Sequence, residues 1–191
     1  VLFRSKMVSA AKLRKAQEAI VQMRPYARKL QDMLSNIVSQ AEGMSSHSLA
    51  VERPVEKVLL IVITSDRGLC GAYNANLIKL AKTTIREKYS ALQAKGNVMI
   101  WSVGKKGFEH FQKNRFSVQP TYRDIFLQLN FESVQACAQA AVAAFEAKEF
   151  DKVELIYSEF KNAATQRFVL EPFLPIPKIE AKDGSKKFDF I

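Results

Sequence analysis

The residues from Ser65 to Gly71 are the first place where this sequence could do chemistry. They follow the apolar run 58–63 and precede a stretch of helical composition, so the chain reads as strand, turn and helix. In α/β proteins such a turn often holds a phosphate at the N-terminus of the helix. The turn matches neither the dinucleotide-binding glycine pattern nor the P-loop pattern. A nucleotide- or phosphate-binding site here is therefore an alternative that only the position supports.

The side chains of the turn also have ordinary structural explanations. Its two glycines permit a tight bend. Asp66 beside Arg67 predicts a local ion pair. Ser65 or Asn74 predicts a cap on the helix that follows. Cys70 has no neighbouring His that would activate its thiol, so nucleophilic catalysis is not indicated.

No other group of residues predicts catalysis, a cofactor or a metal ion. The two histidines, His47 and His110, lie far apart in the sequence, and the two cysteines match no zinc or CxxC spacing. Lys105 and Lys106 follow a second predicted strand and could bind an anion at a helix N-terminus, although a solvated lysine pair is the commoner arrangement. We therefore expect a non-catalytic protein without a cofactor or metal.

The segment that precedes the turn is predicted to be one long helix. Residues 1–41 are rich in Ala, Lys, Arg, Gln, Met and Leu, which favour helix. Their apolar residues recur every seven positions, a pattern typical of a coiled-coil seam. Pro25 falls at the heptad position farthest from this seam, where a bend is compatible with packing. The predicted seam consists of Leu13, Ala16, Ile20, Met23, Ala27, Leu30, Leu34 and Ile37.

Positive charge is concentrated in the same segment. The chain has a formal net charge of +10, and eight of its basic residues lie in residues 1–30 against Glu18 alone. A basic helix permits a second alternative, a nucleic-acid-binding protein. A DNA-binding basic zipper separates its basic region from its heptads, whereas here the two overlap. We therefore expect no nucleic-acid partner.

The predicted helix is long compared with the rest of the chain. About forty helical residues span ~60 Å, whereas a globule of ~140 residues has a radius of gyration of only ~14 Å. The alternative is an amphipathic helix folded onto its own domain, but a domain of this size has no surface so long. We therefore expect the seam to pack against a partner from outside this chain.

The rest of the chain alternates between strand and helix. This order predicts an α/β fold, in which a long N-terminal coiled-coil helix (1–50) is followed by a Rossmann-like, mostly parallel sheet covered by helices (51–191). A hairpin is expected at one edge of the sheet. No apolar run is long enough to cross a bilayer. Strands are predicted at 57–64, 97–103, 152–160, 166–175 and 186–191, and helices at 72–92, 104–114 and 131–150, with 115–130 unassigned.

Three stretches together resemble the gamma subunit of F-type ATP synthases: KMVSAAKLRKAQ (6–17), RPYARKL (24–30) and TSDRGLCGAYN (64–74). The similarity covers nearly the whole chain from Lys6 onward. It implies a central rotor shaft, in which an N-terminal and a C-terminal helix form an antiparallel coiled coil within the ring of alpha and beta subunits. It also implies that the Rossmann-like domain binds the epsilon subunit and the c-ring, and that alpha and beta, not gamma, bind nucleotide.

The same resemblance implies roles for particular residues. The turn would lie near the lever loops of the beta subunits, which are acidic in the family, and the first heptads would form the upper shaft. Contact with a membrane would come only through the complex, on the cytoplasmic face of a bacterial membrane rather than the mitochondrial inner membrane. The residues implied to contact other subunits are Lys6, Met7, Lys12, Leu13, Arg14, Ser65, Asp66, Arg67, Gly68, Leu69, Cys70 and Gly71.

The sequence departs from the family at both ends. The family continues into a long C-terminal helix, whereas this sequence stops at Ile191, and the first five residues do not match the family's start. We expect both ends to reflect truncation or an artefact of a gene fragment.

Overall fold

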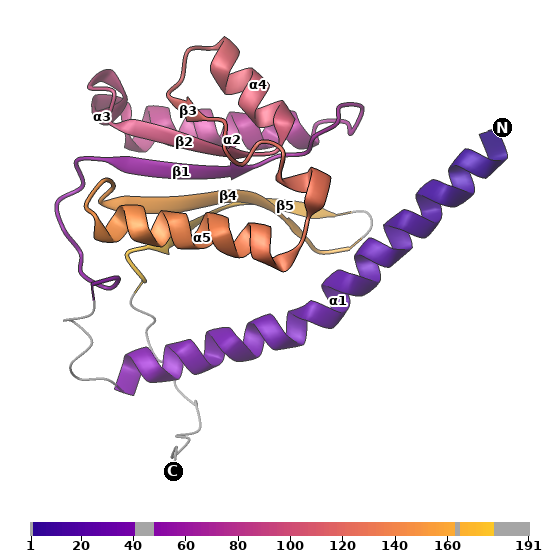
Figure 1. The fold of residues 1–191 in the computed structure, drawn as a ribbon, viewed down its shortest axis with the longest axis horizontal. Coiled ribbons are helices and arrows are strands. Elements are labelled where there is room, and N and C mark those ends of the chain that lie inside the picture. Colours follow the sequence, from indigo (N-terminus) through magenta and orange to yellow (C-terminus); the bar gives the residue numbers. More distant parts are fainter. Residues whose placement is uncertain (1, 41–47, 163–164, 178–191) are drawn as a thin grey trace. The chain divides into compact units, whose positions relative to one another are not determined.

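A computed structural model of the chain describes residues 2–40, 48–162 and 165–177 (Figure 1). The chain divides into two compact units, one that contains helix α1 (Leu2–Gln40) and one that runs from Ser45 to Pro177. The strand predicted at 186–191 lies outside the described residues, as do the side chains of Lys6, Leu34 and Ile37.

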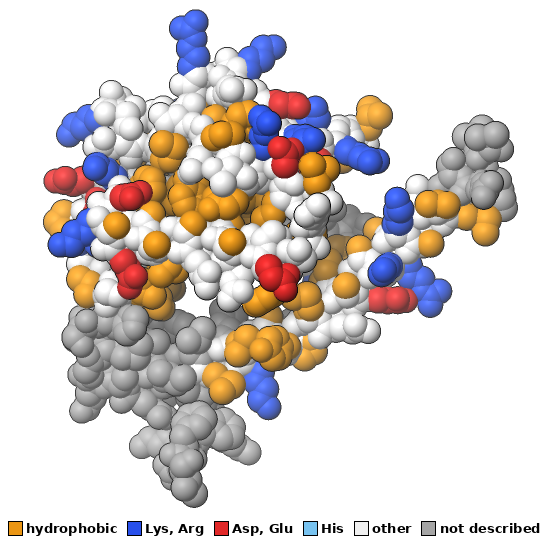
Figure 2. Space-filling model, in the orientation of Figure 1, with side chains coloured by type: hydrophobic (Ala, Val, Ile, Leu, Met, Phe, Trp, Pro, Cys, Tyr) orange, Lys and Arg blue, Asp and Glu red, His pale blue; other side chains and the backbone are white. Residues whose placement is uncertain are grey.

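Helix α1 confirms the prediction of a long N-terminal helix. It is 39 residues long and continues through Pro25, which corresponds to about 58 Å at 1.5 Å per residue. Along it, hydrophobic side chains alternate with Lys and Arg (Figure 2). None of its described side chains is buried; in the predicted seam Leu13 is 56% exposed and Met23 67%. This apolar stripe therefore has no cover within the described part of the chain.

The second unit contains a five-stranded sheet with the strand order β3-β2-β1-β4-β5. β1, β2, β3 and β4 run parallel, and β5 pairs antiparallel with β4 as the predicted edge hairpin. The α/β fold class with a mostly parallel sheet is thus confirmed. The strands are β1 (Val58–Ile63), β2 (Val98–Val103), β3 (Val118–Gln119), β4 (Lys152–Phe160) and β5 (Gln166–Leu174), and the helices α2 (Tyr73–Lys88), α3 (Ser90–Ala94), α4 (Lys105–Lys113), the 3-10 helix η2 (Ile125–Gln128) and α5 (Phe131–Glu146).

Helices cover both faces of this sheet (Figure 1). Val58, Leu60 and Val62 of β1 pack with α2 and α4 on one face. Leu59 and Ile61 pack on the other face with α5. In a parallel strand that is buried on both faces, hydrophobic residues do not have to alternate with polar ones. This double burial explains why the run 58–63 is continuously apolar.

The helix predicted at 131–150 ends at Glu146, and two other regions differ more from the sequence predictions. The helix predicted at 72–92 is interrupted at Tyr89, whose side chain is buried and which separates α2 from α3. The unassigned segment 115–130 contains the two-residue strand β3 and the 3-10 helix η2. Both elements are too short to produce a periodic signal in the sequence.

Arg53 fixes the start of the α/β unit. Its Nε donates to Asp151 Oδ1 at 2.8 Å, and its Nη2 donates to the carbonyl oxygens of Phe145 and Phe150. The guanidinium also lies 4.2 Å from the centroid of the Phe145 ring. The second oxygen of Asp151 accepts from the amides of Glu56 and Lys57. The segment before β1 is thereby attached to the loop between α5 and β4.

This arrangement predicts a pH-dependent contribution of Asp151 to stability. Burial raises the pKa of its carboxyl, but the hydrogen bonds from the Lys57 and Glu56 amides and from Arg53 outweigh it and lower the pKa overall. A lowered folded-state pKa gives stability that is present above the unfolded pKa near 3.9 and is lost as pH falls through the folded value. Asp151→Asn should cost about 1–3 kcal/mol at pH 7 and flatten the loss of stability between pH 5 and pH 2.

Urea unfolding of the full chain at pH 7, 4 and 3 measures this effect. Glu149→Gln, which removes an exposed carboxylate from the same loop, is the matched control and should change the midpoint little. An unchanged acid profile in Asp151→Asn would contradict the assignment.

Candidate functional site

The turn at Ser65–Gly71 lies at the carboxyl end of β1, the central strand of the sheet. From β1 the chain continues through α2 to β2 on one side, whereas β4 reaches the other side of β1 through α5. This is the point where the order of strands reverses, and in open α/β sheets ligand sites form outside the carboxyl ends of strands at such points. The position of the turn is therefore compatible with a bound ligand.

Hydrogen bonds within the turn converge on the carbonyl oxygen of Arg67. Ser65 Oγ donates to it at 2.6 Å and Asn74 Nδ2 at 3.2 Å. Asn74 Oδ1 in turn accepts from the Ser65 amide at 2.9 Å. The prediction that Ser65 or Asn74 caps the following helix is wrong, because the N-cap of α2 is Ala72 and has no side-chain cap. Asn74 instead closes the turn from within the first helical turn.

The same turn occupies the N-terminus of α4. Three acceptors in the turn and in Thr64, the residue before it, take hydrogen bonds from the first three backbone amides of that helix. These amides would otherwise be free to bind an anion. The anion site predicted for Lys105 and Lys106 at this helix end is therefore not supported. The three bonds are Lys105 N to Asp66 Oδ1 (3.1 Å), Lys106 N to Ser65 O (3.1 Å) and Gly107 N to Thr64 Oγ1 (2.9 Å).

Asp66 provides the negative charge at this helix end. A carboxylate near a helix N-terminus is stabilised by the helix dipole. The predicted ion pair with Arg67 is not formed in the described structure, because Asp66 contacts α4 instead. Arg67 is exposed, and no ion pair holds it within the described residues. Its guanidinium is thus available to an acidic group of another molecule.

Leu69 lies at the tip of the turn in an unusual conformation. Its φ is +59° and its side chain is fully exposed. The left-handed region costs a non-glycine residue about 1–2 kcal/mol, and neighbouring Gly71 adopts a similar φ of +60° without that cost. Strained residues cluster at functional sites when the surrounding structure holds them in place. The turn thus displays an apolar side chain to solvent at its tip.

The remaining predicted site residues lie in two places. Gly68 and Cys70 are exposed beside Leu69, and Cys70 is a free thiol. Met7, Lys12, Leu13 and Arg14 are exposed on α1, where Arg14 pairs with Glu18 at 2.8 Å.

No group of three or more His, Cys, Asp and Glu that could hold a metal occurs among the described residues. In that same part of the chain no helix is both long and apolar enough to cross a membrane.

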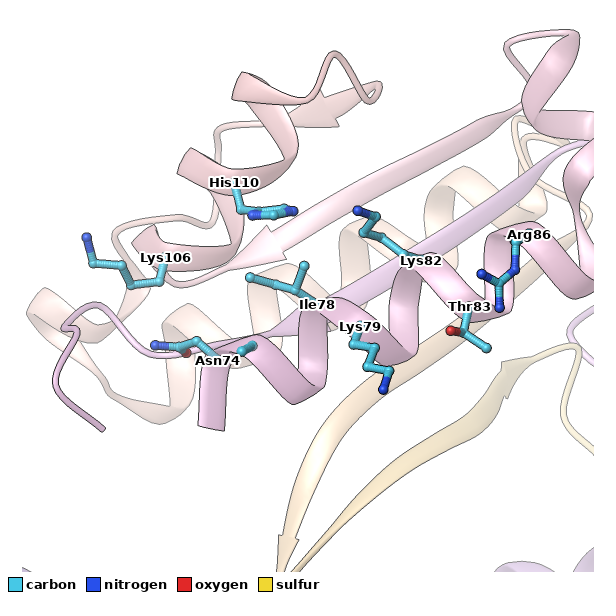
Figure 3. Close-up of a pocket in the computed structure, with 9 residues that line it drawn as sticks. Asn74, Ile78, Lys79, Lys82, Thr83, Arg86, Lys106 and His110 are labelled. Atoms are coloured by element: carbon cyan, nitrogen blue, oxygen red, sulfur yellow. The ribbon is translucent and has the colours of Figure 1, made fainter. Parts of the chain in front are cut away.

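Sequence reasoning missed a basic groove between α2 and α4. Lys79, Lys82 and Arg86 line it from α2, and Lys106 and His110 line it from α4 (Figure 3). The spacing of the three α2 residues places them near one face of a helix and was the only available signal. The contribution of α4 depends on packing between helices and left no sequence motif.

Gly104, the residue before α4, gives a test of the contact between turn and helix. Its φ is +100°, and a Cβ at this position would overlap the carbonyl group of Thr64. Gly104→Ala should therefore cost about 2 kcal/mol more than the conformational penalty alone. Gly96 is a matched control, because its φ is +74° and nothing lies within 4 Å of an added Cβ. Equal losses of stability in the two variants, measured by thermal unfolding, would show that the close approach is not important.

Comparisons with known proteins agree with these observations. The model of the ATP synthase family matches residues 5–191. ATP synthase gamma chains from Cytophaga hutchinsonii and Flavobacterium johnsoniae are each 44% identical, over 90% and 97% of this chain. The alignments cover 58% and 63% of those relatives, so the chain spans under two thirds of their length. A chain of the Tetrahymena thermophila mitochondrial ATP synthase central stalk and c-ring superposes with a TM-score of 0.63 at 25% identity, covering 89% of this chain and 70% of that one.

Proposed function

The chain belongs to the ATP synthase gamma family, and on this premise we propose that it is part of the central-stalk rotor. In this role it transmits torque between the c-ring and the alpha and beta subunits during proton-driven ATP synthesis. It acts without catalysing a reaction itself. The observation that carries the proposal is the apolar stripe of α1, which extends over about four heptads and is exposed wherever its side chains are described.

The length and chemistry of α1 suit a shaft. An isolated helix gains little stability from propensity alone, so a helix of this length requires packing of its apolar face. A second helix with matching heptads would bury the seam, as in a left-handed coiled coil. We propose that the partner is the C-terminal helix of the family, paired antiparallel with α1. The basic residues outside the seam would then face the surrounding subunits.

The turn suits a contact that must form and release repeatedly. Arg67 presents a positive charge and Leu69 an apolar side chain on a backbone held by the bonds to Ser65 and Asn74. An exposed ion pair is worth only about 0–1 kcal/mol, so a contact with the acidic lever loop of a beta subunit would be weak enough to break. A rigid turn transmits a displacement, whereas a deformable one would absorb it. Differential contact with successive states of the partner shifts their populations.

The other partners follow from the same role. We propose that the α/β unit at the foot of the shaft contacts the epsilon subunit and the c-ring. Contact with the membrane would be indirect, through the complex, on the cytoplasmic face of a bacterial membrane. The bacterial relatives support this assignment.

The seam is tested in the full-length subunit, assembled with its partners in membrane vesicles. Leu13→Gln with Ile20→Gln should reduce ATP-driven proton pumping severalfold, because two apolar contacts of the coiled coil become polar. Val8→Gln with Val21→Gln makes the same apolar-to-polar change at exposed residues outside the seam and should leave most of the pumping intact. Full pumping in the seam variant would contradict the shaft. ATP hydrolysis by the purified chain alone, or salt-dependent binding of duplex DNA with a sequence preference, would favour the alternatives.

The turn is tested separately by Leu69→Gly. This change removes the exposed side chain and relieves the positive φ, so the subunit should be more stable by about 1 kcal/mol. Coupling between hydrolysis and pumping should nevertheless fall. Lys148→Gly is the matched control, since Lys148 also has a φ of +59° but lies at the end of α5. It should add stability and leave coupling unchanged; equal coupling in both variants would exclude Leu69 as a contact.

A further inference from the structure

The groove between α2 and α4 is lined by basic and apolar residues, and the proposed stalk function gives them no role. Its volume is about 570 Å³, within the range of small-molecule sites. Figure 3 shows Ile78 and Lys82 of α2 directed toward α4 and His110 of α4 directed back toward α2. No Asp or Glu is among the described residues that line it. The hollow is thus small, cationic and walled in part by apolar side chains.

Part of this positive charge is not compensated. Lys106 pairs with Glu109 at 2.7 Å and Arg86 with Glu87 at 3.3 Å. Neither Lys79 nor Lys82 forms an ion pair within the described residues. Like charges three or four residues apart on a helix destabilise it, and Lys82 is three residues from Lys79 and four from Arg86. An anion in the groove would relieve this repulsion.

The spacing of the cations indicates the shape of that anion. Lys79 and Arg86 are seven residues apart, about 10.5 Å along the helix axis. A single phosphate is too short to contact both ends of this row, whereas a chain of linked phosphates can follow it. Lysine and arginine are the usual ligands of phosphate oxygens in proteins. A hollow between two helices also fits a small anion better than a broad protein surface.

We propose that the α2–α4 groove binds a phosphate chain, either free or as the tail of a nucleotide. Lys82 and Arg86 from α2 bind the phosphate oxygens. Lys106 of α4, which is directed away from α2 in Figure 3 and pairs with Glu109, would have to turn toward the groove to contribute. This site is separate from the turn at Ser65–Gly71, and it neither requires nor supports the stalk function.

His110 should report on the bound anion. Burial, followed by the charges of Lys82 and Lys113, lowers the pKa of its imidazole. Its Nε2 is enclosed and has no hydrogen-bond partner among the described residues. The charged groups around it are Lys82 from α2 and Lys106, Glu109 and Lys113 from α4. A nearby phosphate favours the protonated ring, so binding should raise the pKa of His110.

The test is calorimetric titration of the full chain with tripolyphosphate at constant ionic strength. Lys82→Gln with Arg86→Gln should weaken binding about tenfold. Lys88→Gln with Lys95→Gln removes the same charge from exposed positions outside the groove and should change affinity less than twofold. Because the chain has only two histidines, NMR of the imidazoles, assigned with His47→Gln, should show His110 shifting on titration with its pKa raised.

Comparison of ligands separates the two forms of the proposal. Equal affinity for tripolyphosphate and ATP assigns the site to the phosphate chain alone, and tighter binding of ATP assigns it to a nucleotide tail. Equal weakening in the two double variants would show a non-specific effect of net charge and would overturn the site. An oligoglutamate of equal charge that bound as tightly, or an unshifted His110 signal at millimolar tripolyphosphate, would overturn it as well. None of these results bears on the seam of α1.

Discussion

Burial of β1 on both faces is the constraint on which the described α/β unit depends. α2 and α4 cover one face of this strand and α5 covers the other. The carboxyl end of β1 is consequently fixed beside the N-terminus of α4. Thr64, Ser65 and Asp66 are then close enough to satisfy the first three amides of that helix. The turn is therefore a rigid part of the sheet and not a free loop.

The turn in the α/β unit and helix α1 differ in the side chains that they expose to solvent. In the turn, polar groups are paired with one another and with α4, and one strained apolar residue, Leu69, is displayed. In α1, by contrast, a whole apolar stripe is left without cover among the described side chains. A paired polar turn contributes rigidity, and an exposed apolar stripe contributes a drive to associate. The proposed role in a rotor would use both properties, a lasting contact along α1 and a transient contact at the turn.

The anion site predicted at Lys105 and Lys106 was decided by hydrogen bonding rather than by motif. A glycine-bearing turn after a buried strand is compatible with phosphate binding, and nothing in the order of the residues excludes it. At the N-terminus of α4 the side chain of Asp66 decides the matter, because it already accepts a hydrogen bond from the helix end that an anion would need. In the basic groove, by contrast, the tertiary structure creates a candidate site. Basic residues that form no motif in the sequence line one groove because α2 packs beside α4.

The sequence by itself determined the long helix, the four longer strands of the sheet and the edge hairpin, because hydrophobic periodicity is a local property that persists in the fold. It also determined the double burial of 58–63, which a continuous apolar run indicates. Only the tertiary structure decided that Asn74 closes the turn, that Asp66 binds α4 and that His110 and Lys82 line the same groove. Asp66 and Lys105 are 39 residues apart in sequence, and His110 and Lys82 belong to different helices. Such contacts depend on how elements pack, and no local pattern records that.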